Sequence, residues 1–194
     1  MRWFCAVVVV VVGVAVLPSQ AHVVIPAEFR EVATEATLIV RGRVTDVRSV
    51  VEPGNGIESI AAVAVESVLK GQAGGFVYVR VPGGEVGRSK VVMVGAPTFR
   101  VGQRAVFFLK PNATDSSFRP IGLTLGVYRV QSEPGTGRPV IAPPVVAGRT
   151  APLFGPTTRG DTRRKLMPVR DFEALVRVVL AAPSGRATPR GGGQ

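Results

Sequence analysis

Hydrophobic and polar residues alternate with a period of two along most of the chain after Thr37. Such alternation is typical of half-buried strands, and clusters of glycine and proline separate one alternating segment from the next. The pattern predicts eight strands, which cover residues 37–48, 57–69, 76–81, 90–94, 104–109, 118–121, 126–130 and 140–146. Many short strands with turns between them favour an antiparallel sandwich or barrel.

The period changes to that of a helix at two places, one on each side of the predicted strands. Phe29, Val32 and Ala33 share a helical spacing, which predicts a short helix over residues 27–35. Residues 170–182 predict a second, amphipathic helix. Its apolar residues recur at i, i+3, i+4 and i+7, and they are Phe172, Leu175, Val176 and Val179.

These elements predict a mainly β fold with a single domain. We expect a small antiparallel OB-like barrel of about five to eight strands, with a short N-terminal helix and a C-terminal amphipathic helix. The domain is expected to cover residues 22–182, with a loose segment rich in Pro, Gly and Arg at 147–167 and the helix at 170–182. Residues 183–194 are polar and end in glycines, and we expect this tail to be disordered.

Residues 1–21 have the three-part pattern of a secretory signal peptide. Arg2 supplies a positive start, residues 4–17 are uninterruptedly apolar, and Pro18 precedes the small residues Ser19 and Ala21. The apolar stretch is shorter than the roughly 20 residues that span a bilayer as a helix. We therefore expect an exported protein, periplasmic or extracellular, without a membrane span once the leader is removed. An uncleaved N-terminal anchor stays open as the alternative.

The single cysteine, Cys5, lies within the leader, so the mature domain would have no disulfide and no thiol chemistry.

The formal net charge of the chain is +11, which favours polyanionic ligands such as nucleic acid, anionic lipid or acidic glycan. The alternative is a GC-rich genome, which encodes basic positions with arginine codons. The cluster Arg163, Arg164 and Lys165 is the candidate polyanion contact.

Nucleic acid is not the expected ligand. The chain has nine Phe, two Tyr and one Trp, and along the sequence these aromatics do not interleave with the basic residues as stacking platforms would. The expected export of the protein also makes nucleic acid a less suitable partner.

Several strand segments resemble an uncharacterised family of exported bacterial β-barrel proteins. The segments include Leu-Ile-Val-Arg-Gly-Arg-Val at 38–44, Val-Glu-Ser-Val-Leu-Lys-Gly at 65–71 and Ala-Val-Phe-Phe-Leu at 105–109. The resemblance covers roughly residues 30 to 180 and implies no known activity.

The order and spacing of the same segments more distantly resemble the netrin-like modules, which are OB-type barrels and include the tissue inhibitors of metalloproteinases. This second resemblance implies a five-stranded barrel and an exported metalloprotease as a partner. Netrin-like modules carry disulfides, which the mature domain here would lack.

Candidate chemistry is sparse. The one histidine, His22, would be the first residue after cleavage, where its imidazole and α-amine could chelate copper or zinc. A general base is seldom positioned on a free chain end. The 13 acidic residues are scattered, so we expect no enzyme activity, no catalytic residues and no cofactor.

The favoured interpretation is an exported, non-enzymatic binding or interaction domain of unknown ligand. The alternative is a modulator or inhibitor of a secreted metalloprotease that acts through His22. A third hypothesis is a hydrolase that uses paired carboxylates.

Overall fold

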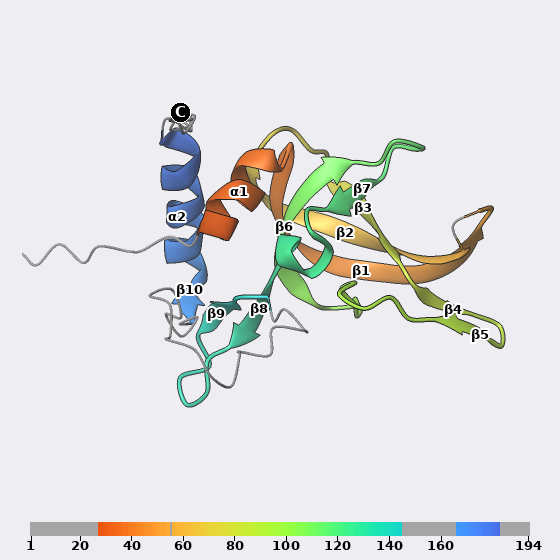
Figure 1. Cartoon of the computed structure of the whole chain (residues 1–194). Coiled ribbons are helices and arrows are strands. Elements are labelled where there is room, and N and C mark those ends of the chain that lie inside the picture. The colour runs from red at the N-terminus through yellow and green to blue at the C-terminus, as the bar shows by residue number, and fades with distance from the viewer. Residues whose placement is uncertain (1–26, 55, 145–165, 183–194) are drawn as a thin grey trace, which may run out of the picture.

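The computed structural model describes residues 27–54, 56–144 and 166–182. Within these ranges the chain forms two helices and ten strands, and both helices lie at the same end of the molecule (Figure 1). In chain order the elements are α1 Ala27–Glu35, β1 Leu38–Glu52, β2 Gly56–Lys70, β3 Phe76–Pro82, β4 Gly84–Val86, β5 Ser89–Val91, β6 Arg104–Pro111, β7 Phe118–Pro120, the 3-10 turn η1 Leu123–Gly126, β8 Val127–Ser132, β9 Pro139–Ala142, β10 Met167–Pro168 and α2 Val169–Ala181. The expectation of a mainly β domain with one helix at each end is confirmed.

Eight of the strands form one sheet in the order β1-β2-β3-β7-β6-β8-β9-β10, and β4 and β5 form a separate hairpin. Strand β6 also pairs with β1 along its length. Neighbours are antiparallel except β3 and β7, which meet in parallel through the single pair Val79 and Phe118. The eight strands do not close into a barrel as a whole, because β8, β9 and β10 extend beyond β6. The sheet is therefore larger than the small antiparallel barrel expected from the sequence.

Two hydrophobic cores lie on opposite faces of the central strands. One is enclosed by β1, β2, β3 and β6 and includes Val63, Val79 and Phe107. The other lies between the sheet and the helices, where Phe29 of α1 and Phe172 of α2 meet Phe108 of β6. Because both faces of β6 are covered, every residue from 105 to 109 is buried. This explains why the segment is a continuous apolar run instead of an alternating one.

Some predicted elements differ from the observed ones. The fourth strand is Ser89–Val91, where the sequence predicted 90–94, and it pairs with the unexpected strand β4. Strand β3 ends at Pro82, as the glycines after it predict. Gly83 and Gly84, at φ 94° and 151°, bend the chain there into this hairpin.

At the C-terminal end, β9 is Pro139–Ala142, where residues 140–146 were predicted. Strand β10 begins at Met167, the last residue of the segment that was expected to be loose, and Met167 pairs with Ile141. The two helices match their predictions to within one residue at each end.

Candidate functional site

The site residues predicted from the sequence, His22, Arg163, Arg164 and Lys165, all lie outside the described residues. These predictions therefore stay untested. Within the described ranges, no group of three or more His, Cys, Asp or Glu side chains is arranged to hold a metal ion. In the same part of the chain, no helix is long and apolar enough to cross a membrane.

Strand β3 exposes two aromatic side chains side by side. Phe76 is 59% exposed and Tyr78 is 49% exposed, whereas Val77 and Val79 between and beyond them are buried in the first core. Alternate residues of a strand point to opposite faces, so both rings project from the same outer surface of β3. Aromatic rings of this size are usually buried, and an exposed adjacent pair is typical of a binding surface.

The strand register extends this surface across β2 and β1. Residues directly opposite each other on neighbouring strands point to the same face. The opposed residues, read from β1 through β2 to β3, form three rows: Arg43–Ala64–Phe76, Asp46–Ala62–Tyr78 and Arg48–Ile60–Arg80. We call the surface formed by Arg43, Asp46, Arg48, Ala62, Ala64, Phe76 and Tyr78 the outer face.

The outer face has a low centre and taller edges. Ala62 and Ala64 on β2 provide only methyl groups, whereas β3 carries the two rings. On β1, Arg43 and Arg48 are exposed. A strip of small residues between aromatic and cationic side chains can accommodate an elongated ligand that stacks on one edge and forms ion pairs with the other.

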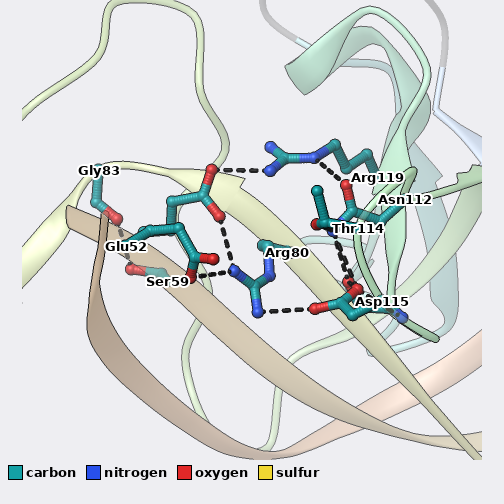
Figure 2. Close-up of polar contacts among 10 residues, drawn as sticks. Glu52, Ser59, Arg80, Gly83, Asn112, Thr114, Asp115 and Arg119 are labelled. Carbon is teal, nitrogen blue, oxygen red and sulfur yellow. Dashed lines mark hydrogen bonds and ion pairs between the residues drawn. The ribbon is translucent and has the colours of Figure 1, made fainter. Parts of the chain in front are cut away.

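A polar cluster borders the outer face at the end of its third row (Figure 2). Its centre is Arg80, which is 9% exposed although it lies on the outward side of β3. The Nη1 group of Arg80 donates to Glu52 Oε2 at 2.7 Å and to Glu58 Oε2 at 3.1 Å, and Nη2 donates to Asp115 Oδ2 at 2.7 Å. Burial opposes the charge of Arg80, but the bonds to Glu52 and Glu58 outweigh burial and raise its pKa.

Arg119 on β7 completes the cluster from the other side. Its Nη2 group donates to Glu58 Oε1 at 2.7 Å, and its Nε donates to Asn112 Oδ1 at 2.9 Å. Glu58, which is only 3% exposed, therefore binds one guanidinium with each of its oxygens. Such full pairing is what allows a carboxylate to be buried.

The loop between β6 and β7 supplies the third carboxylate. Asp115 accepts hydrogen bonds from the Ser117 hydroxyl, from the Asn112 amide at 2.9 Å and from the Ser117 backbone N–H at 2.9 Å. These bonds, with the Ser117 hydroxyl contributing most, lower the pKa of Asp115 to about 2. Through Arg80, the cluster fixes this loop and the end of the β1–β2 hairpin to β3.

The cluster has the properties of a structural clamp. Its three carboxylates, Glu52, Glu58 and Asp115, each contact a guanidinium within 3.1 Å. Each of these carboxylates is thus engaged by an arginine of the protein itself instead of being directed at a substrate. The cluster therefore positions the border of the outer face and is a poor candidate for catalysis.

Sequence analysis missed the outer face and the clamp. The alternation Phe-Val-Tyr-Val at 76–79 is the local signal for exposed rings. The arginines come from β1, and only the register of β1 on β2 on β3 brings them onto the same face.

An open groove between β9 and α2 is a weaker candidate. It is lined by Pro139, Val140, Pro168 and Val169 and by several charged residues. Two of those charges are already paired, because Arg41 Nε lies 2.8 Å from Glu173 Oε1. The groove has no aromatic lining, so the outer face has the stronger features of a binding site.

Comparison with known proteins assigns the chain to no group. No protein-family model matches the sequence, and no curated protein matches it significantly.

Proposed function

We propose that this chain is a non-enzymatic binding domain that holds an acidic oligosaccharide on its outer face. The observation that carries the proposal is the adjacent exposure of Phe76 and Tyr78, at 59% and 49%, on a strand whose other side is fully buried. Exposed rings on a rigid strand provide stacking surfaces at little cost in conformational entropy. Sugar rings and nucleobases are the ligands that such surfaces accept most readily.

An OB-type arrangement of five strands supports this location. The pairings β1–β2, β2–β3, β3–β7, β7–β6 and β6–β1 return to their starting strand, with the β3–β7 contact parallel. In OB folds the face of the second and third strands, with the adjoining loops, binds oligonucleotides and oligosaccharides. The outer face lies on the first three strands, and the clamp joins the β1–β2 and β6–β7 connections that border it.

Charge selects the acidic class of ligand. Arg43 and Arg48 lie in the same rows as the β3 residues, and the chain as a whole has a formal net charge of +11. Asp46 between them disfavours an anion at the central row, so the expected ligand carries acidic groups at intervals along its length. We also propose that the protein is exported, with residues 1–21 as its signal peptide. An exported protein meets acidic glycans more readily than nucleic acid.

The modulation of a secreted metalloprotease is the second candidate. The same circle of strand pairings favours it, since netrin-like modules are OB-type barrels. In that case the free amine of His22 would approach the protease's zinc. Extension of the mature N-terminus by one residue would then abolish inhibition, whereas changes to Phe76 would not affect it.

Calorimetric titration of the purified full-length protein tests the principal proposal. The probes are a hexamer of galacturonic acid, the neutral galactose hexamer and a single-stranded hexadeoxynucleotide. We expect the acidic hexamer to bind and its affinity to fall with salt, because ion pairs to Arg43 and Arg48 are screened. Phe76→Ala or Tyr78→Ala should each weaken binding about tenfold, which corresponds to roughly 1.4 kcal/mol for a lost stacking contact.

The control is Val178→Ala, which removes an exposed apolar side chain of α2 that is not part of the outer face. It should bind like the parent protein. Equal binding by the Phe76 and Tyr78 variants would disprove the location of the site. Tighter binding of the oligonucleotide than of the acidic sugar would disprove the ligand class.

A further inference from the structure

Four consecutive apolar residues project into solvent, beginning with Val91 at the end of β5. The exposed fractions are 43% for Val91, 76% for Val92, 47% for Met93 and 84% for Val94. Scattered exposed valines are common on protein surfaces, but a continuous exposed apolar run is unusual without a functional reason. We call residues 91–94 the apolar loop.

The hairpin that carries the apolar loop is firmly held on the sheet. The Ser59 hydroxyl donates to Gly83 O at 2.7 Å, and Gly83 N donates to Ile57 O at 2.8 Å. Gly84 lies so close to Ser49 and Ser59 that a Cβ there would come within 2.7 Å of both hydroxyls. Figure 1 shows β4 and β5 at the end of the molecule remote from the helices.

The apolar loop is also fixed at its far end. Thr124 donates to Gly95 O from its hydroxyl at 2.7 Å and from its backbone N–H at 3.1 Å. Beyond Gly95, Phe99 enters the first core at 9% exposure. The loop is thus a short apolar projection between two anchored points.

The loop and the outer face occupy different sides of the sheet. The hairpin rests on Ser49 and Ser59, which lie opposite each other on β1 and β2. Arg48 and Ile60, their chain neighbours, point to the outer face. A ligand on the outer face would therefore leave the apolar loop free.

The exposure of all four side chains of the apolar loop favours lipid as its partner. Only Val91 belongs to a strand, the chain turns at Val94 and Gly95, and all four side chains from Val91 to Val94 are exposed. A flat protein surface would cover only one side of such a segment. Lipid acyl chains and headgroups can surround it on every side.

Cations around the apolar loop select anionic lipid. Residues 84–101 contain Arg88, Lys90 and Arg100 but only one acid, Glu85, and all four are exposed. The Glu85–Lys90 pair is 3.8 Å long and about two-thirds exposed at both ends, so it neutralises Lys90 only weakly. Apolar insertion together with basic residues at headgroup depth is the combination that binds anionic bilayer surfaces.

From these observations, we propose that the apolar loop docks this protein on an anionic phospholipid bilayer, with Val92 and Val94 inserted and Arg88 and Lys90 at the headgroups. This proposal is independent of the proposed oligosaccharide site. A docked protein would present its outer face away from, or alongside, the membrane surface.

Sedimentation with phospholipid vesicles tests the docking. The full-length protein is mixed with vesicles of phosphatidylcholine alone or with one-third phosphatidylglycerol, and the bound fraction is measured. We expect binding to the anionic vesicles that exceeds binding to the neutral ones. The double variant Val92→Ser, Val94→Ser should bind the anionic vesicles at least about tenfold more weakly, since two valine side chains lose their burial in lipid.

The matched control is the double variant Val68→Ser, Val178→Ser, which alters two exposed valines elsewhere and should bind like the parent. Arg88→Gln with Lys90→Gln should reduce binding to anionic vesicles and leave binding to neutral vesicles unchanged. The proposal is overturned if the Val92, Val94 variant binds as well as the parent, since net charge or the N-terminal segment would then hold the protein on the vesicle. It is also overturned if that variant converts a dimer into a monomer in sedimentation equilibrium, because a second copy would then cover the loop.

Discussion

Removal of the Glu58 carboxylate should destabilise the protein more than any other single change in the clamp. Glu58 is 3% exposed and binds Arg80 at 3.1 Å and Arg119 at 2.7 Å. In Glu58→Gln the shape is kept, but the charge is lost and an amide N–H₂ faces at least one guanidinium. Neither guanidinium can compensate fully for the missing acceptor.

The expected loss of stability in Glu58→Gln depends on which hydrogen bonds Arg80 and Arg119 keep. Breaking a buried ion pair by removing one partner costs about 3–5 kcal/mol. Arg80 keeps Glu52 and Asp115, each at 2.7 Å, and Arg119 keeps Asn112 at 2.9 Å. We therefore expect a loss near the lower end, about 3 kcal/mol of the free energy of unfolding.

Urea unfolding followed by far-UV circular dichroism measures this loss. With a slope of about 2 kcal/mol per molar, the midpoint should fall by roughly 1.5 M. The control is Glu85→Gln, whose pair with Lys90 is 3.8 Å long and 65–67% exposed, and which should cost no more than about 0.5 kcal/mol. The reasoning is refuted if the two variants unfold at the same midpoint.

Two further predictions concern the pH dependence and the helical core. The pKa of Asp115 is about 2 in the folded chain, below its ordinary 3.8, so its stabilisation is complete above pH 4 and is lost as pH falls towards 2. The side chain is 35% exposed, so solvent screening should limit this to about 1 kcal/mol, and Asp115→Asn should remove that part of the acid sensitivity in urea midpoints taken from pH 6 to 2. Phe108→Ala should cost about 3–5 kcal/mol, because the ring is fully buried and contacts Phe29, Tyr128 and Phe172. The exposed Phe76→Ala should cost less than about 0.5 kcal/mol. Thermal unfolding scans of the two variants measure both losses of stability, and equal losses would contradict the assignment of one ring as buried and the other as exposed.

The helices and the strongest strands could be predicted from the sequence because their signals are local. The spacing of Phe172, Leu175, Val176 and Val179 defines one face of α2, and Phe172, Val176 and Val179 are buried there. The apolar run at 105–109 predicted a strand, and its lack of alternation agrees with burial on both faces.

The outer face and the clamp could not be predicted in the same way because they depend on register. The sequence indicated that arginines and aromatics do not interleave along the chain. In the sheet, Arg43 and Phe76 belong to one row across β2, although 32 residues lie between them in the sequence. Arg80 has the alternation of a solvent-facing residue, and it is buried where Glu52, Glu58 and the loop after β6 meet it.

The pairing of β1 with β6 sets when this chain can fold. The backbone N–H of Thr37 donates to the carbonyl of Leu109, 72 residues away, and β1 remains without its second partner until β6 has been synthesised. Contacts of such high sequence separation slow folding. The emerging chain is therefore expected to fold late, with its apolar strands open to aggregation in the meantime. Slow folding, usually a liability, would suit the export that we propose, because an exported chain crosses a membrane before it acquires its structure.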